Sequence, residues 1–142
     1  MMDEPPHAPT PERVNHELAQ AENELAAAHS LLENSHLNIA ISSGYFACFH
    51  AARAVLYQRG VMPVTHKGVR AELNRVMVKE GGLEKAWAEI LEEQHNEREL
   101  ADYHSYSRSI TAAEATRLVN DAQRFVQRMK ELIDEERKHS AA

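Results

Sequence analysis

The sequence predicts an all-α protein, an antiparallel bundle of about five helices. Apolar residues recur at intervals of three and four in five separate segments, which is the spacing of one face of a helix. No segment shows the apolar–polar alternation of a half-buried strand. The links between segments are short, which favours antiparallel neighbours. The five predicted helices are residues 11–33, 37–59, 66–79, 83–102 and 111–137.

Capping signals mark where three of these helices begin. Thr10 followed by Pro11 suits the N-cap and the first helical position. Thr65 can cap the third helix, and Thr111 with Glu114 three residues later forms a capping box for the last one. Turn-forming residues mark the helix ends, namely Asn34-Ser35, Gly60 with Pro63, and Gly81-Gly82.

The helix at 37–59 is predicted to lie in the centre of the bundle because it is apolar nearly all round. Beside its broad apolar face runs a stripe of small residues, which allow a neighbouring helix to approach closely. These small residues are Ala40, Gly44, Ala47 and Ala51. Cys48 lies on the broad face, and we expect it to be a small core residue.

The chain of 142 residues is long enough for one domain with its own core. We expect this domain at 11–138, between flexible tails at 1–10 and 139–142. A single cysteine excludes a disulfide within the chain. No run of about 18 apolar residues is present, and the acidic, proline-rich N-terminus lacks the apolar segment of a signal peptide. The simplest expectation is a cytoplasmic protein with no membrane-spanning segment.

Charge is unevenly distributed along the chain. The net charge of −6 by itself argues against a nucleic-acid-binding protein. Residues 34–71, however, contain no Asp or Glu but include Arg53, Lys67 and Arg70. One basic patch on an acidic body could bind phosphate, so these three residues are phosphate-binding candidates. The alternative is that the stretch is mainly a core helix, in which charged residues of either sign are scarce.

The stretch 97–106, ERELADYHSY, carries the residues best suited to catalysis. Arg98 continues the inward-facing stripe of its helix, where a guanidinium is costly unless it is paired or lines a wet cleft. Arginine matches the geometry of phosphate, and His104 can move protons near neutral pH. Arg98 and His104 together suit cleavage of a phosphodiester without a metal ion.

The spacing of this pair leaves two interpretations open. Six residues correspond to about 240° around a helix, so Arg98 and His104 cannot share one helical face. They can cooperate only if the helix ends near Asp102 or if a second subunit completes the site. Alternatively, Arg98 forms an i,i+4 ion pair with Asp102, which contributes about 0.2–0.5 kcal/mol, and His104 is merely exposed nearby.

Two other kinds of site have weaker support. Glu33 with His36, and Glu92 with His95, show the Glu-x-x-His spacing of bundles that bind two metal ions. The first pair crosses a predicted helix break, and the second lies at the edge of its apolar stripe, so we expect no metal site and no cofactor. A hydrolase triad is also disfavoured, because no acidic residue lies near His50 in the sequence to orient it.

Three features of the sequence together resemble the small stand-alone HEPN domains (higher eukaryotes and prokaryotes nucleotide-binding). The resemblance covers about residues 37–132, most of the chain. The features are the stretch 43–56, SGYFACFHAARAVL; Gly60 followed by His66; and Arg98-x-x-x-Asp102-Tyr103.

The resemblance implies a helical bundle that forms a homodimer and is often encoded beside a minimal nucleotidyltransferase. Many HEPN proteins are metal-independent ribonucleases that act as toxins of toxin–antitoxin pairs. Their motif is an arginine, four to six residues, then a histidine, which Arg98 and His104 match with five residues between them. Asp102 and Tyr103 would support this pair. The form His104-Ser105-Tyr106 makes Tyr106 the candidate acceptor of AMP from the antitoxin.

The sequence also departs from the family pattern. The residue after the motif arginine is often Asn, Asp or His, whereas here it is Glu99. The branch with the Arg-x-x-x-Asp-Tyr signature often lacks the histidine. Two hypotheses therefore compete. The first is an RNA-cleaving toxin with Arg98 and His104 at a dimer cleft, and the second is a non-catalytic module that binds a nucleotide or a partner nucleotidyltransferase.

Overall fold

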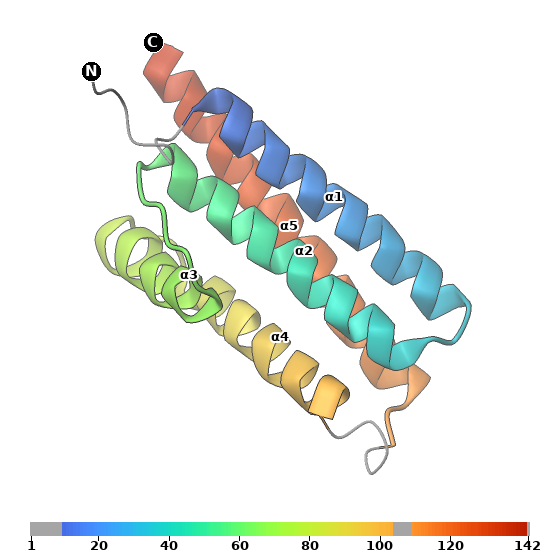
Figure 1. Cartoon of the computed structure of the whole chain (residues 1–142). Helices are drawn as coiled ribbons and strands as arrows, with labels where there is room; N and C mark the ends of the chain where they lie inside the picture. Colours follow the sequence, from blue (N-terminus) through green and yellow to red (C-terminus); the bar gives the residue numbers. More distant parts are fainter. Residues whose placement is uncertain (1–9, 104–108, 142) are drawn as a thin grey trace.

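The computed structural model describes residues 10–103 and 109–141. Figure 1 shows α1, α2 and α5 side by side along the length of the molecule, with α3 and α4 on the opposite side of α2. Consecutive long helices run in opposite directions, so the predicted all-α antiparallel bundle is confirmed. Within the described residues the elements are α1 (Pro11–Glu33), α2 (Leu37–Gln58), α3 (His66–Glu72), the π-helix η1 (Leu73–Glu80), α4 (Lys85–Tyr103) and α5 (Ala112–Ala141).

Helix α2 is the central element, as its composition predicted. It packs against α1, α3, α4 and α5. Its small residues Ala40, Ala47 and Ala51 are completely buried. A methyl group placed on Gly44 would lie 3.6 Å from the Cβ atom of Ala122, which shows how closely α2 and α5 approach. Cys48 is also completely buried, and this burial raises the pKa of its thiol.

By length and composition, α2 is the one helix in the described part of the chain that could cross a membrane. In the fold, however, 67% of its most apolar 18-residue window is buried among the other helices. A core helix is buried in this way, so packing within the bundle accounts for the apolar composition of α2.

The predicted helix caps are all present. The hydroxyl of Thr10 accepts a hydrogen bond from the backbone N–H of Arg13 at 3.1 Å. The Thr65 hydroxyl accepts from the N–H of Gly68 at 2.9 Å. The Thr111 hydroxyl accepts from the N–H of Glu114 at 3.1 Å, as expected for a capping box. These bonds satisfy backbone donors that have no partner within their helices.

Gly60 ends α2 through a turn that places α3 against the centre of the bundle. Its φ of +81° lies in the left-handed region, which residues other than glycine rarely adopt. The N–H of Gly60 donates to the carbonyl of Tyr57 at 3.0 Å, and the N–H of Val61 donates to Leu56 at 2.9 Å. This is the Schellman pattern of a helix C-terminus.

The third predicted helix, 66–79, differs from the structure in its second half. The chain is α-helical only to Glu72 and then continues as η1. The wider π turn ends at Gly81, where a methyl group would lie 2.9 Å from the carbonyl oxygens of both Val76 and Met77. Glycine is therefore required by this close approach of the backbone. Helical periodicity in the sequence does not distinguish an α from a π turn over so short a segment.

Two helix boundaries also differ from the predictions. Helix α4 begins at Lys85 instead of residue 83, because the N–H of Leu83 donates to the carbonyl of Met77 in the preceding turn. Helix α5 continues beyond residue 137 to Ala141, through residues 139–141 that were expected to be a tail. Near this end, α5 is held against the C-terminus of α2, where Arg59 pairs with Glu136 at 2.6 Å.

Candidate functional site

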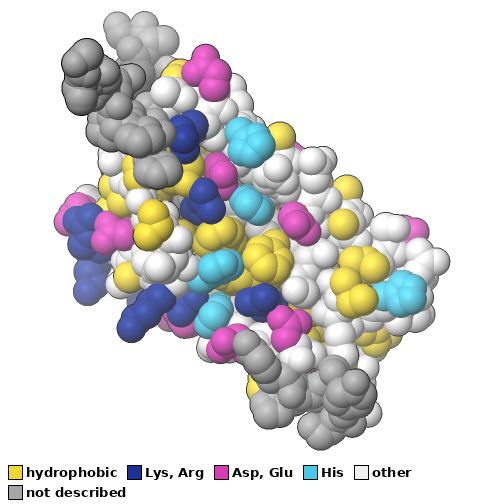
Figure 2. Space-filling model, viewed as in Figure 1, with side chains coloured by type: hydrophobic (Ala, Val, Ile, Leu, Met, Phe, Trp, Pro, Cys, Tyr) yellow, Lys and Arg dark blue, Asp and Glu magenta, His cyan; other side chains and the backbone are white. Residues whose placement is uncertain are grey.

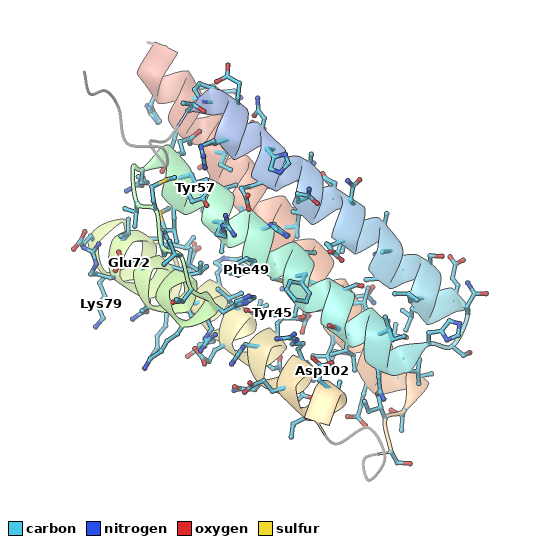
Figure 3. The ribbon with its side chains drawn as sticks, viewed as in Figure 1. Tyr45, Phe49, Tyr57, Glu72, Lys79 and Asp102 are labelled. Carbon is cyan, nitrogen blue, oxygen red and sulfur yellow. The ribbon has the colours of Figure 1, made fainter. Side chains whose placement is uncertain are left out.

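The candidate site surrounds Tyr45, at the place where α2 faces α3 and α4. Figure 3 shows Tyr45 and Phe49 on this side of α2 and Asp102 near the C-terminal end of α4. Tyr45 is completely buried, and its hydroxyl lies 2.6 Å from Nδ1 of His66. Burial raises the pKa of Tyr45, although the nearby Arg70 guanidinium opposes the rise. The tyrosine therefore carries its proton at neutral pH.

His66 is held between aromatic rings of α2. Its ring stacks on Phe49, with ring centres 4.1 Å apart and planes 15° apart. It also lies edge-on to Phe46 at 5.8 Å. Burial lowers the pKa of His66, and the positive charge of Arg98 lowers it further. His66 is therefore a neutral imidazole at pH 7, held in a fixed orientation.

His95 approaches the same tyrosine from α4. Its ring centre is 5.7 Å from that of Tyr45, and its Nε2 lies 3.5 Å from the Glu99 carboxylate. The Nδ1 atom is buried without a hydrogen-bond partner. Burial lowers the pKa of His95, and Arg70 adds to this effect. The site thus holds two neutral histidines, one on each side of Tyr45.

Arg98 lies over the aromatic rings of α2. Its guanidinium carbon is 5.0 Å from the ring centre of Phe46 and 5.8 Å from that of Tyr45, which are cation–π distances. The predicted i,i+4 pair is also present, with Nε 2.8 Å from Oδ2 of Asp102. The contact is an ion pair and not a hydrogen bond of regular geometry. Arg98 is therefore held by the Asp102 carboxylate and by the aromatic rings of α2.

Arg70 brings a second guanidinium to the site from α3. Its Nε lies 3.5 Å from the half-exposed carboxylate of Glu92, and its Nη1 is buried without an acceptor. The positive charge of Arg70 acts on Tyr45, His66 and His95. We call these five residues the Tyr45 cluster: Tyr45, His66, Arg70, His95 and Arg98.

The two remaining phosphate-binding candidates flank this cluster. Arg53 lies 5.2 Å from the ring centres of both Phe49 and Tyr57, and its Nε donates to the Tyr57 hydroxyl at 3.0 Å. Lys67 is exposed and, with Arg70, lines a hollow of about 410 Å³ between α3, η1 and α4. The structure therefore brings Arg53, Lys67 and Arg70 to the same side of the molecule as Arg98.

Charges of both signs lie on this side of the molecule. Figure 2 shows Lys, Arg and His side chains over α2, α3 and α4, with hydrophobic and acidic side chains among them. Residues 34–71, which contain no Asp or Glu, supply α2 and most of α3. The acids that face these basic residues come from α1 and α4, namely Glu17, Glu92 and Asp102.

A second histidine arrangement was not predicted from the sequence. Glu17 of α1 is buried and lies 2.8 Å from Nδ1 of His50, and its carboxylate is 3.4 Å from Nε of Arg53. No acidic residue lies near His50 in the sequence, and the acid that contacts it comes from 33 residues earlier in the chain. The only sequence signal was the position of Glu17 on the inward stripe of its helix, between Val14 and Ala21.

Three predicted residues cannot be placed in this geometry. His104 and Tyr106, the proton-transfer and AMP-acceptor candidates, lie outside the described residues. Tyr103 ends α4, and its side chain likewise lies outside the described part. Their roles stay predictions.

The residues considered for metal binding have other partners. Glu92 faces Arg70, and His95 faces Glu99. Glu33 and His36 are exposed at the junction of α1 and α2. Across residues 10–103 and 109–141, no three His, Cys, Asp or Glu side chains come together as a metal-binding group would.

A larger hollow, of about 550 Å³, lies where α1 begins and α2 and α5 end. The arginines that line it pair with side chains of the helices around it: Arg59 with Glu136, and Arg137 with Asn15 at 2.9 Å. The arginines of the Tyr45 cluster also have carboxylate partners, but they lie beside the imidazoles of His66 and His95. This grouping of guanidinium and shifted imidazole groups makes the Tyr45 cluster the better candidate for a ligand site.

Comparison with known proteins identifies the class of protein. The HEPN domain family model matches residues 14–132. A Methanocaldococcus jannaschii protein named "Putative toxin" is 34% identical over 115 residues, which is 81% of this chain and 84% of the relative. A "UPF0332 protein" of Pyrococcus horikoshii is 36% identical over 90 residues, 63% of each chain. A second M. jannaschii "Putative toxin" is 26% identical over 116 residues, 82% of this chain and 78% of the relative.

The chain therefore belongs to the HEPN domain family, as its sequence features indicated. The match covers α2, α3, η1 and α4 completely, together with most of α1 and part of α5. All the members of the Tyr45 cluster lie within it.

The depressed pKa values of His66 and His95 predict how stability depends on pH. Both values lie below 6.5 in the folded protein, so the unfolded chain takes up protons first as the pH falls. The free energy of unfolding should therefore decrease as pH is lowered from 7 through 6.5 towards the folded-state values. Urea unfolding at a series of pH values measures this slope.

The variant His66→Gln should remove part of that slope, and His139→Gln, which changes an exposed histidine near the end of α5, should leave it intact. Equal slopes in wild type and His66→Gln would show that His66 has the same pKa in the folded and unfolded states.

Proposed function

We propose that this HEPN protein is a metal-independent, RNA-cleaving toxin whose reaction takes place at the Tyr45 cluster. One observation carries the proposal. Arg98 lies over the Tyr45 and Phe46 rings, and its guanidinium and that of Arg70 both act on Tyr45 and His66. Two guanidinium groups beside one histidine suit a phosphodiester, which offers several acceptor oxygens and a negative charge.

In this proposal, RNA supplies its own nucleophile. The 2′-hydroxyl attacks the adjacent phosphorus, and His104 takes up the hydroxyl proton. The bond from phosphorus to the 5′-oxygen breaks, which leaves a 2′,3′-cyclic phosphate, and the departing 5′-oxygen takes a proton from solvent. Arg98 stabilises the negative charge that develops on the phosphoryl oxygens. Arg53, Lys67 and Arg70 hold neighbouring phosphates of the strand, and Asp102 orients Arg98 through the 2.8 Å contact. The names of the M. jannaschii relatives support a toxin role.

We propose further that the active unit is a homodimer in which two copies of residues 97–106 face each other. Leu100 supports this, because it is a large apolar side chain left 39% exposed two residues after Arg98. Light scattering at tens of micromolar should give twice the 16.1 kDa chain mass, and Leu100→Asp should lower it. A mass of 16.1 kDa for the wild type without a partner would contradict the dimer.

A minimal nucleotidyltransferase is the antitoxin in this proposal, and Tyr106 accepts AMP from it. An added phosphate beside His104 would repel the phosphate of RNA and switch the toxin off. Incubation with such a partner and ATP, followed by mass spectrometry of peptides, should locate AMP on Tyr106. An adduct found only on other residues would reject this form of control.

The ribonuclease proposal predicts that Arg98→Ala and His104→Ala each abolish RNA cleavage. Loss of a donor that stabilises transition-state charge typically lowers the rate by about 10²–10³, and loss of a proton-transfer group by about 10²–10⁴. Arg128→Ala is the matched control, since Arg128 on α5 is similarly exposed (24% against 29% for Arg98) and pairs with Glu131. Gel analysis of end-labelled RNA measures the rates.

A second control separates stability from chemistry. His50→Ala should lower the thermal midpoint more than it lowers cleavage, because it leaves the buried Glu17 carboxylate without its histidine. Wild-type protein that is folded by circular dichroism but does not cleave RNA would overturn the ribonuclease assignment. The HEPN protein would then be a non-catalytic module that binds a nucleotide or a nucleotidyltransferase.

A further inference from the structure

The hydrogen bond between Tyr45 and His66 defines which nitrogen of the histidine carries its proton. Tyr45 is protonated and His66 is neutral, so one of the two groups donates across the 2.6 Å contact. Arg70 and Arg98 beside Tyr45 are donors only, and Nδ1 of His95 makes no hydrogen bond to the hydroxyl, so within the described residues His66 is the acceptor for the tyrosine proton. The Tyr45 hydroxyl therefore donates to Nδ1, and the imidazole proton lies on Nε2.

The Nε2–H group of His66 is accessible to a ligand. In the described part of the chain, His66 makes its one hydrogen bond through Nδ1. His66 is partly exposed, so its second ring nitrogen, Nε2, is available to a ligand.

Two guanidinium groups lie near His66. Arg70 and Arg98 both act on Tyr45 and His66. Arg98 and His66 also share Phe46, at 5.0 and 5.8 Å from its ring centre. Guanidinium groups beside an imidazole N–H favour a ligand with negative charge and several acceptor oxygens, and a phosphate has both.

We propose that His66 is a substrate-binding residue that donates its Nε2–H to a phosphate oxygen of the RNA held by Arg98, and that Tyr45 is the positioning residue that keeps this proton on Nε2. The proposal rests on the ribonuclease function above and identifies a second histidine of that site. It gives the buried Tyr45 hydroxyl a role in recognition, because without it the imidazole could place its proton on either nitrogen. His66 binds phosphate, and His104 transfers the proton.

Two probes separate binding from cleavage. A single-stranded RNA with 2′-O-methyl groups at every position keeps its phosphates but has no nucleophile, so its affinity, measured by fluorescence anisotropy, reports binding alone. The same sequence without the methyl groups reports cleavage. Nitrogen-15 NMR of the histidine rings reports the tautomer of His66 directly.

His66→Leu, which removes the donor, should weaken binding of the methylated RNA and lower kcat/KM by about 10- to 100-fold, the range for one hydrogen bond to a charged group. His66→Gln, which keeps an N–H at the end of its side chain, should stay within about threefold of wild type.

Tyr45→Phe should retain the fold but move the His66 signals from the Nε2–H form towards a mixture of tautomers. His139→Leu on α5 is the control and should bind and cleave as wild type does.

Different outcomes separate this inference from the proposed function. Wild-type binding by His66→Leu, or an Nδ1–H tautomer in the wild-type protein, would overturn the role of His66 even if Arg98-dependent cleavage is observed. If the wild type does not cleave RNA but His66→Leu still weakens binding of the methylated strand, the ribonuclease function fails and the phosphate contact stands. If His66→Leu does not fold, the Gln and Phe variants and the NMR signals decide the question.

Discussion

The hydrogen bond from Tyr45 to His66 is the interaction on which the candidate site depends. It joins the central helix α2 to the start of α3, and His95 and Arg98 of α4 approach the same tyrosine. Tyr45 is completely buried, so its hydroxyl must be hydrogen-bonded, and His66 satisfies it. The core packing of α2 and the orientation of the site histidine are therefore set by one side chain.

The same arrangement explains the electrostatics of the site. Arg53, Arg70 and Arg98 lower the pKa of His66 together with burial, while the acids Glu92 and Glu99 face His95 from partly exposed positions. Two imidazoles stay neutral among three arginines, and each arginine lies near a carboxylate: Arg53 near Glu17, Arg70 near Glu92 and Arg98 near Asp102. An anionic ligand would bind here through the donor groups of these arginines and of His66, and not through unpaired charge.

Much of the fold could be predicted from local sequence, because the signals involved are local. Threonine caps, Gly60 and the helical spacing of apolar residues act within a few positions of each other, and they identified the helices and the central place of α2. The sequence also predicted that Arg98 faces inward and pairs with Asp102, since i and i+4 share a helical face.

The remaining features depend on contacts between distant segments. Two contacts form only when different helices pack together, namely Glu17 with His50 and Tyr45 with His66. The periodicity of one helix does not predict which residue of another helix it will meet. The π-helical form of η1 depends on a close backbone approach at Gly81. His66 contributed to the family resemblance through its position after Gly60, but only the fold shows that it lies beside Arg98.

The most direct measurement of the central claim is an NMR titration of the histidine side chains with 2′-O-methyl RNA. If the Tyr45 cluster holds phosphate, the ring signals of His66 and His95 shift and saturate together, while those of exposed His16, His36 and His139 stay in place. The variant His66→Gln assigns its signal. Saturating shifts confined to the exposed histidines, or unchanged His66 and His95 signals at RNA concentrations that saturate anisotropy, would contradict the account.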